Sequence, residues 1–258
     1  MSVFEPSPYP LRELIHAGAV FFCSHSGGKD SQAMYAHLLA AGIPDSQIVV
    51  VHADLGEVEW NGVQDHIRNT IDHDLHVVRA NKTLLEMVQR RFESRPEVPS
   101  WPSSATRQCT SDLKRGPIYK FIRRWMKENR QTLGVNCMGI RAEESSTRAK
   151  KEPFKLNTAL SKAGREVYEW MPIFDWSTDQ VFRKIKDSNQ QPFWAYEQNE
   201  RLSCVFCIMG SRNDLMHGLL QRPELFRKYT ELEQATGWTM FQKQSLSERI
   251  GLIPAVQI

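Results

Sequence analysis

A short glycine-containing stretch near the N-terminus constrains this sequence more than any other feature. The apolar residues 19–23 precede it and predict a buried strand, and residues 32–41 follow it and predict a helix that ends at Gly42. The stretch between them is Ser24-His25-Ser26-Gly27-Gly28-Lys29-Asp30-Ser31. A tight turn between a strand and a helix leaves backbone N–H groups available to an anion, and the positive end of the helix dipole assists them. The sequence therefore predicts a phosphate-binding loop.

The residue types in this loop suit a phosphate ligand. Gly27 and Gly28 permit positive φ and a close approach of the ligand, Lys29 adds a positive charge, and hydroxyl donors come from Ser26 and Ser31. The pattern is not a Walker A motif, in which four residues separate two glycines and Lys and Ser or Thr follow. The alternative is an ordinary glycine-rich turn between a strand and a helix, which a Gly-Gly pair alone would favour.

Strands and helices alternate along the rest of the chain. The sequence predicts strands at 47–54, 75–79 and 134–140, and helices at 11–18, 59–72, 83–92, 117–129 and 177–188. The strand at 47–54 is continuously apolar, which is typical of a parallel sheet buried on both faces. We expect an α/β fold: a doubly wound, mostly parallel sheet of about five strands flanked by helices, with a hairpin within 155–172.

We expect two domains, an α/β domain over residues 1–190 and a helical C-terminal lobe over residues 191–258. In a doubly wound sheet, ligands bind at the carboxyl ends of the strands. Asp54 lies at such an end and is a candidate to contact the adenosine part of a nucleotide, because a carboxylate accepts from hydroxyl or amine donors. The alternative role for Asp54 is a helix cap or a loop carboxylate.

Composition excludes some classes of protein. The chain has 258 residues, a formal net charge of +3 and no run of eighteen apolar residues, which argues against a membrane partner. Residues 1–10 are polar and proline-rich and lack the pattern of a signal peptide, so we expect a cytoplasmic protein. Basic residues are concentrated between Arg107 and Arg130, where we expect either one basic helix face that binds nucleic acid or an ordinary solvated surface.

The five cysteines suggest a soft-ligand site rather than a disulfide framework, because their number is odd. Cys204 and Cys207 form a C-x-x-C pair, and Cys109, in a polar loop with basic neighbours, is the best candidate for a third ligand. The three could hold an iron–sulfur cluster, could bind zinc with His217 as fourth ligand, or could act as a metal-free redox site. Cys23 and Cys137 fall in predicted strands, where we expect small core residues.

Several motifs together resemble the phosphoadenylyl-sulfate (PAPS) reductase family within the PP-loop ATP pyrophosphatases, whose fold is that of the adenine nucleotide alpha hydrolases. The resemblance covers roughly residues 20–210 and is carried by residues 26–31, 51–54, Cys109 with Leu113, Lys114 and Pro117, Gly139-Ile140-Arg141 with Glu144, Ser145 and Arg148, and 171–177 with Val181. PAPS reductases carry a catalytic Glu-Cys-Gly motif near the C-terminus, whereas residues 245–258 contain no cysteine. Adenylyl-sulfate reductases carry a paired Cys-Cys, whereas Cys109 has no adjacent cysteine.

The pattern is more similar to the sulfur-transfer branch, which includes DNA phosphorothioation enzymes and tRNA thiolases. That similarity implies an ATP pyrophosphatase that adenylates an acceptor, releases pyrophosphate and then transfers sulfur. The alternatives are a thiol-dependent reductase of phosphoadenylyl or adenylyl sulfate and a nucleotide-binding subunit without catalytic activity.

The resemblance also implies roles for individual residues. Lys29, Asp30, Arg141 and Arg148 would be catalytic, with Asp30 organising Mg²⁺ and the arginines neutralising phosphate charge. The residues expected to contact ATP or PAPS are Ser24, Ser26, Gly27, Gly28, Lys29, Asp30, Ser31, Asp54 and Gly139. The alternative role for the two arginines is a surface ion pair with Glu143 or Glu144.

The expected metal ligands are Cys109, Cys204 and Cys207, for a [4Fe-4S] cluster first and for zinc second. The expected partners are an adenine nucleotide, nucleic acid on the basic stretch 107–130, a sulfur-donor protein and a second copy of the chain in a homo-oligomer.

Overall fold

The structure is a computed structural model that describes residues 10–252, and its central element is a six-stranded sheet with the strand order β3-β2-β1-β4-β6-β5. The strands are β1 Val20–Ser24, β2 Ile48–Asp54, β3 Leu75–Arg79, β4 Leu133–Met138, β5 Phe154–Leu156 and β6 Glu166–Trp170. β1 pairs in parallel with β2 and β4, β4 pairs in parallel with β6, and β5 pairs antiparallel with β6. The predicted doubly wound, mostly parallel sheet is confirmed. Both strands of the predicted hairpin join it, which raises the number of strands to six.

The strand order reverses beside β1. The chain passes from β1 through α2 to β2 on one side, whereas β4 pairs with the other side of β1. Doubly wound sheets bind ligands at the carboxyl ends of the strands at such a switch point. The stretch that follows β1, residues 24–31, therefore lies at the expected ligand position of the sheet.

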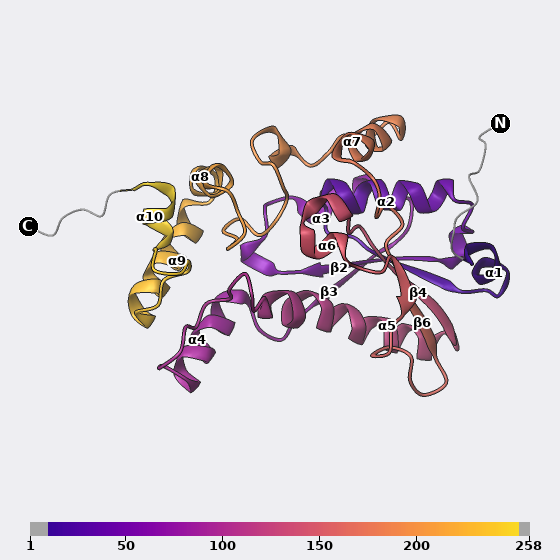
Figure 1. The fold of residues 1–258 in the computed structure, drawn as a ribbon, viewed down its shortest axis with the longest axis horizontal. Coiled ribbons are helices and arrows are strands. Elements are labelled where there is room, and N and C mark those ends of the chain that lie inside the picture. Colours follow the sequence, from indigo (N-terminus) through magenta and orange to yellow (C-terminus); the bar gives the residue numbers. More distant parts are fainter. Residues whose placement is uncertain (1–9, 253–258) are drawn as a thin grey trace, which may run out of the picture. The chain divides into compact units, whose positions relative to one another are not determined.

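Helices surround this sheet and continue into the C-terminal part of the chain. They are α1 Leu11–His16, α2 Lys29–Ala40, α3 Val63–Asn69, α4 Leu84–Ser94, α5 Gly116–Glu128, α6 Ser146–Ala149, α7 Thr178–Asp187, α8 Arg212–Gln221, α9 Pro223–Thr236 and α10 Leu246–Ile250. α2 and α7 cover one face of the sheet and α5 covers the other (Figure 1). Side chains alternate along β1, so Phe21 and Cys23 join one core while Val20 and Phe22 join the other.

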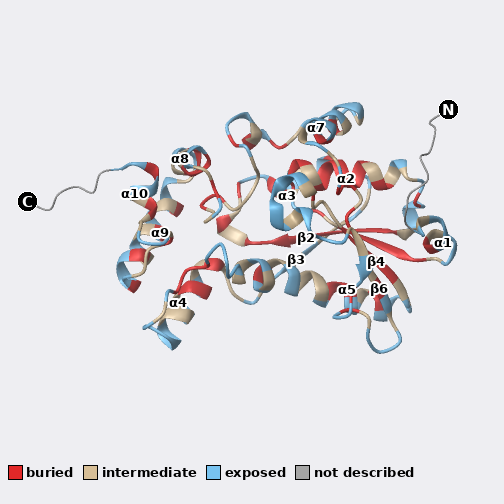
Figure 2. Ribbon diagram, viewed as in Figure 1, coloured by how far each residue is buried: buried red, intermediate tan, exposed pale blue. Residues whose placement is uncertain are grey.

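β2 is buried along its whole length, as its continuous apolarity predicted (Figure 2). The predicted helix over 59–72 is shorter in the structure, because Gly62 has a φ of +84° and α3 begins only after it. Thr83 and Ser177 each form a capping box, at the start of α4 and α7 respectively.

The described chain divides into two compact units. The first contains residues up to 53, 62–78 and 118–193, and the second contains residues 54–61, 79–117 and 194 onward. The change at residue 193 is near the expected boundary at 190, but the second unit also includes two segments from the first half of the chain. One reason is local packing within that unit: Trp101 donates from Nε1 to the Trp238 oxygen at 2.8 Å, and its ring lies 5.4 Å from that of Tyr229.

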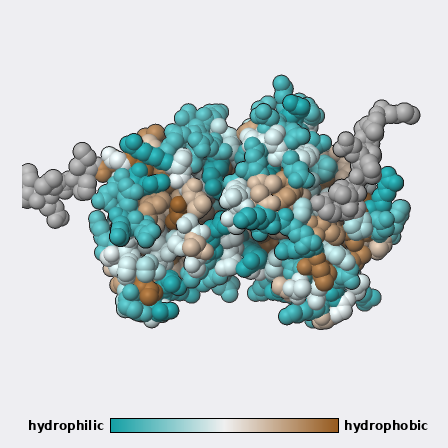
Figure 3. All heavy atoms as spheres, viewed as in Figure 1, coloured by the Kyte–Doolittle hydropathy of each residue, from teal (hydrophilic) through white to brown (hydrophobic). Residues whose placement is uncertain are grey.

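No helix in the described part of the chain is both long and apolar enough to cross a membrane. Hydrophilic residues cover most of the face drawn in Figure 3, between smaller hydrophobic patches.

Two histidines of the first unit, the buried His25 and the partly buried His37, prefer the neutral state. Burial lowers the pKa of His25 to about 3, and the neighbouring His52 and His66 lower it further. Burial, with a contribution from Lys184, lowers the pKa of His37 to about 4. Histidine in an unfolded chain titrates near ~6.5, so the unfolded chain binds more protons than the folded chain between that pH and the folded pKa values.

We predict that the free energy of unfolding falls as the pH is lowered from 7 to 5. Each of these histidines contributes a slope of up to ~1.4 kcal/mol per pH unit between its unfolded and folded pKa values. Urea denaturation at a series of pH values measures this slope, and His37→Leu is expected to reduce it. A stability that stays constant from pH 7 to pH 5 contradicts the prediction.

Candidate functional site

The loop after β1 has the geometry of an anion-binding turn. Gly27 has a φ of +76°, a conformation that favours glycine, and Gly28 is the N-cap of α2 without a side chain that could cap it. The first turn of this twelve-residue helix therefore presents its N-terminus at the switch point of the sheet. Ser26 is exposed, whereas Gly27, Gly28 and Lys29 are buried. The predicted residues are thus together in one turn, and its helix N-terminus can attract a phosphate.

Two backbone donors of the loop are already bound to side chains within it. The Ser26 amide donates to Ser31 Oγ at 3.1 Å, and the Gly27 amide donates to His25 Nδ1 at 3.1 Å. Ser31 Oγ in turn donates to the Gly28 oxygen at 2.8 Å. The sequence pattern did not single out His25, because nothing in it shows that this ring turns back onto the loop. Ser24, the first residue of the stretch, ends β1 and donates from Oγ to Asn136 Oδ1 at 3.0 Å.

The charged residues of the loop join a buried ion-pair network. Asp30 accepts from Lys29 Nζ through Oδ2 at 3.2 Å and from Arg141 Nε through Oδ1 at 2.7 Å. Arg141 is only 2% exposed, and its NH1 also donates to Glu143 Oε2 at 2.6 Å. The network connects the start of α2 to the chain segment that follows β4.

The remaining guanidinium contacts of Arg141 are to the protein as well. NH1 donates to the Trp176 oxygen at 3.0 Å and NH2 donates to Thr178 Oγ1 at 3.2 Å. Arg148 is paired with Glu144. Arg148 therefore has the ion pair that the sequence left open as an alternative. Arg141 pairs with Glu143 as that alternative allowed, but it is buried rather than on the surface and pairs with Asp30 as well. Contact of either arginine with phosphate stays a prediction.

Asp30 does not fit the expected role of Mg²⁺ ligand in this arrangement. Each of its carboxylate oxygens accepts from a cationic side chain. Mg²⁺ is bound through oxygen ligands, and both oxygens of this carboxylate are engaged by Lys29 and Arg141, so we assign no step to Mg²⁺ at Asp30.

Gly139 lies against the first turn of α2 rather than in open space. A Cβ at this position would lie 2.8 Å from the backbone carbon and oxygen of Asp30 and 2.9 Å from the Ser31 nitrogen. The motif that contains Gly139 therefore supports the loop by allowing two backbone segments to approach closely.

Asp54 belongs to the second unit, where Gly56 and Arg79 are among its partners. Its Oδ1 accepts from the Gly56 amide at 2.6 Å, and its Oδ2 accepts from Arg79 Nε at 3.1 Å. This is the loop-carboxylate geometry that the sequence left open as an alternative. Its contact with adenosine stays a prediction.

The second unit brings Cys109, Cys204 and Cys207 within electrostatic range of one another and of Lys114. Burial raises the pKa of Cys204 to about 12, although Lys114 acts in the opposite direction. Burial also raises the pKa of Cys109, again against the effect of Lys114. The Met209 amide donates to Cys207 Sγ at 3.4 Å. The three cysteines are therefore in one unit, and their role as a ligand set stays a prediction.

Tyr229 is a residue of this region that the sequence did not identify. It is fully buried, its hydroxyl has no partner among the described residues, and its ring lies 5.2 Å from that of Phe206. Burial raises the pKa of Tyr229 well above its usual value, and the cysteines add to this effect.

The fit to a metal is poor in the conformation described. Within residues 10–252, no three His, Cys, Asp or Glu side chains are arranged to hold a metal ion. His217, the expected fourth zinc ligand, is hydrogen-bonded through Nδ1 to Asn199 Oδ1 at 2.7 Å, and its ring lies 5.0 Å from that of Trp60. Neither an iron–sulfur cluster nor zinc is supported by this arrangement. Cys23 and Cys137 are buried core residues, as expected.

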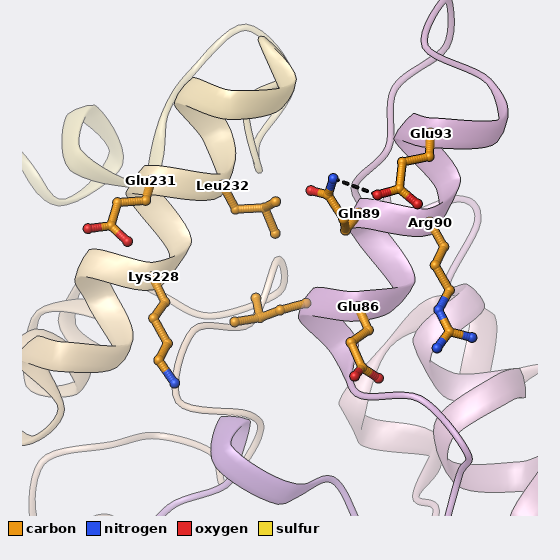
Figure 4. A pocket seen from close by; sticks show the side chains of 8 residues that line it. Glu86, Gln89, Arg90, Glu93, Lys228, Glu231 and Leu232 are labelled. Atoms are coloured by element: carbon orange, nitrogen blue, oxygen red, sulfur yellow. Dashed lines mark hydrogen bonds between the residues drawn. The ribbon is translucent and has the colours of Figure 1, made fainter.

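A separate cavity of about 410 Å³ lies between α4 and α9 in the second unit. Its lining combines leucines with charged residues of both signs (Figure 4), namely Leu85, Glu86, Gln89, Arg90, Glu93, Lys228, Glu231 and Leu232. None of the predicted site residues is among them.

The basic stretch 107–130 does not form a single helix face. Thr110–Arg115 is a π-helical turn that precedes α5, and Lys114 within it is only partly exposed and belongs to the cysteine group. The exposed basic residues of α5 are Lys120, Arg123, Arg124 and Lys127. The opposite face of α5 packs against the sheet. The basic surface that this helix can offer to nucleic acid is therefore its exposed face alone.

We predict that Gly139→Ala distorts the loop and destabilises the protein by about 1–3 kcal/mol, because backbone atoms lie where the new Cβ would be. Urea denaturation and titration with a fluorescent ATP analogue measure the two effects. Gly134→Ala is the matched control, since its Cβ would meet side-chain atoms of Met126 and Phe22 at 3.3 Å, and the flexible Met126 can move. Equal losses in both variants contradict the prediction.

We predict that Arg141→Met lowers the free energy of unfolding by about 3–5 kcal/mol, because Asp30 loses the partner of one carboxylate oxygen in a buried site. Arg141→Lys is expected to recover only part of the loss, since lysine cannot reproduce the guanidinium fork. Arg148→Ala, which breaks a more exposed pair, is expected to cost about 0–1 kcal/mol. Urea denaturation checks the order of the three variants, and a harmless Arg141→Met would contradict it.

Comparison with known proteins finds similarity to curated and solved proteins, among them the following three. The chain is 26% identical over 208 residues to an uncharacterized protein of Methanocaldococcus jannaschii, and the match covers 79% of this chain but only 39% of that protein. A phosphoadenylyl-sulfate (PAPS) reductase from Candida auris, in complex with phosphate, aligns with a TM-score of 0.44 at 14% identity, over 70% of this chain and 79% of that one. An FMN adenylyltransferase from Candida glabrata, in complex with ATP, aligns with a TM-score of 0.36 at 15% identity, over 65% and 46% of the two chains.

The family model of the phosphoadenosine phosphosulfate reductase domain matches residues 20–214, a range that includes the loop after β1, Gly139, Arg141 and all three cysteines of the second unit. Because this match covers well over half of the chain, the chain belongs to the phosphoadenosine phosphosulfate reductase domain family.

Proposed function

We propose that this chain is an adenine-nucleotide-dependent enzyme that adenylates an acceptor and releases pyrophosphate. The observation that carries the proposal is the glycine turn at the switch point of the sheet, where α2 begins without a side-chain cap at its N-terminus. Membership of the reductase domain family supports the use of a nucleotide in sulfur chemistry.

In the proposed reaction, an oxygen of the acceptor attacks the α-phosphorus of ATP. The bond between that phosphorus and the α–β bridging oxygen breaks, and the electron pair leaves with pyrophosphate. The loop would hold the leaving group through Ser26, the N-terminal amides of α2 and the ammonium group of Lys29. Lys29 Nζ is 3.2 Å from Asp30 Oδ2, so Asp30 orients this charge within the loop. Such fixed positive groups stabilise negative charge that develops on the leaving oxygens.

The finer proposal is that the adenylated acceptor then receives sulfur through the cysteine group. A cysteine that carries an additional sulfur from a donor protein attacks the activated carbon, and AMP leaves with the oxygen. A second cysteine attacks the first cysteine's sulfur, which releases the acceptor thiol and leaves a protein disulfide that an external thiol reduces. The cysteine group supplies the two thiols that this route needs. The positive charge of Lys114 beside them favours the thiolate form.

A cluster or zinc on Cys109, Cys204 and Cys207 stays a separate prediction. Iron, zinc and acid-labile sulfide determined on anaerobically purified protein test it, and the metal-free route above needs none of them. A homo-oligomer and a cytoplasmic location stay predictions as well.

The acceptor could be nucleic acid bound by the exposed face of α5. Lys120, Arg123, Arg124 and Lys127 would contact phosphates, and such binding weakens steeply as salt increases. Gel-shift titrations with DNA and tRNA at several salt concentrations test this part. If neither nucleic acid binds at low salt, the acceptor is a small molecule.

We predict that the purified chain releases pyrophosphate from ATP in the presence of its acceptor and that Lys29→Ala lowers this rate by about 100-fold. The expected cause is the lost charge at the leaving group. Assays coupled to pyrophosphate, with pools of small RNA, DNA and low-molecular-weight extract as acceptors, measure the rate. Lys186→Ala, an exposed lysine of α7, is the control and is expected to leave the rate unchanged.

Two outcomes contradict the proposal in different ways. Formation of sulfite from PAPS without cleavage of ATP indicates a thiol-dependent reductase, the second candidate that the family supports. Binding of ATP without pyrophosphate release or sulfite formation under any of these conditions indicates a nucleotide-binding subunit without catalytic activity.

A further inference from the structure

His25 makes a contact with the loop that its position in the sequence does not reveal. Its ring is buried, with only 2% of the residue exposed, and Nδ1 accepts from the Gly27 amide at 3.1 Å. Gly27 is the residue of the loop with positive φ. The bond therefore acts on the backbone unit whose conformation determines the direction of the turn.

The backbone of His25 is fixed on both sides as well. Its amide donates to the Val51 oxygen at 2.8 Å, and its carbonyl oxygen is hydrogen-bonded to His52 Nδ1 at 2.9 Å. The ring lies 6.5 Å from that of Tyr35, at an interplanar angle of 66°. The acceptor atom is thus held by β2 and α2 rather than by the loop itself.

The hydrogen bond also determines the tautomer of His25. A backbone N–H can only donate, so Nδ1 carries no proton and the neutral ring is protonated at Nε2. Nε2 is buried without a hydrogen-bond partner among the described residues. Leaving a buried N–H group unpaired costs free energy, so this tautomer must be favoured by another interaction of the ring. Here that interaction is the hydrogen bond that Nδ1 accepts from the Gly27 amide.

We propose that His25 is a positioning residue for the nucleotide loop: its neutral Nδ1 holds the Gly27 amide so that the N-terminus of α2 remains open to the phosphates. In this arrangement Ser26 and Gly27 use their amides for the shape of the loop, and the amides of the first turn of α2 bind the ligand. The inference rests on the proposed binding of nucleotide phosphates at this loop.

The inference differs from the role that the sequence suggested for Gly27, which was direct contact with phosphate. The low pKa of His25, about 3, supports the positioning role, because a ring that is neutral above that pH keeps Nδ1 as an acceptor throughout the physiological range. Protonation of His25 would place a donor opposite the Gly27 donor and would break the bond.

Two substitutions separate the hydrogen bond from the bulk of the ring. His25→Asn places an amide oxygen close to the position of Nδ1, whereas His25→Leu fills the space without an acceptor. We expect His25→Leu to weaken the binding of a non-hydrolysable ATP analogue by about tenfold, the loss of roughly one hydrogen bond, and His25→Asn to bind within about twofold of the unchanged protein. His37→Asn, at a partly buried histidine of α2, is the control and is expected to bind normally.

A second measurement does not depend on nucleotide binding. Nitrogen NMR of the full chain, without ligand, distinguishes an unprotonated Nδ1 from a protonated one, and the Gly27 amide proton reports its own hydrogen bond. We expect His25 to show an unprotonated Nδ1 from pH 6 to pH 8, and the Gly27 amide signal to move in His25→Leu but to stay close to its place in His25→Asn.

The outcomes can be told apart. If the unchanged protein does not bind the ATP analogue, the proposed function fails, while the NMR signals still test the contact between His25 and Gly27. If the analogue binds but both His25 variants bind equally well, or if Nδ1 carries the proton, the positioning role of His25 is overturned. Thermal melting of each variant identifies any loss that results from unfolding.

Discussion

The buried pair between Asp30 and Arg141 is the interaction on which the predicted site depends. It joins the first turn of α2 to the segment after β4, at the place where the strand order of the sheet reverses. A charge that is only 2% exposed is tolerated because carboxylate, carbonyl and hydroxyl oxygens surround the guanidinium group. The same contacts fix the carboxylate that pairs with Lys29. The lysine that would meet a phosphate is therefore oriented by a network reaching as far as α7.

The cysteine group of the second unit depends on a different balance. Burial favours neutral thiols, whereas Lys114 favours thiolates, and the three sulfurs repel one another when charged. A site of this kind responds strongly to any added positive charge, whether a metal or a cationic substrate. The unpartnered hydroxyl of Tyr229 adds a potential donor to the same buried region. The sulfur transfer that we propose rests on these features of the cysteine group.

Much of the fold could be predicted because its signals are local. Continuous apolar runs indicated the buried parallel strands, Ser177 indicated the start of α7, and Gly27 with Gly28 indicated the turn at the end of β1. Two differences from the prediction have local causes. The helix predicted over 59–72 is shorter because of the conformation of Gly62. The basic stretch does not form one helix face, because Lys114 lies near the cysteines instead. The extent of the second unit could not be predicted, because its segments are separated in the sequence and are united by contacts such as that between Trp101 and Trp238.

The sequence by itself determined the alternation of strands and helices, the position of the glycine turn and the residue types available for chemistry. Hydrophobic periodicity, helix capping and backbone conformation depend on neighbouring residues, so they are legible without a structure. Only the tertiary structure decided that Arg141 binds Asp30, 111 residues away, that Gly139 supports α2, and that His25 turns back onto Gly27. These partners are selected by strand order and side-chain direction, which depend on how the whole chain packs rather than on any short pattern.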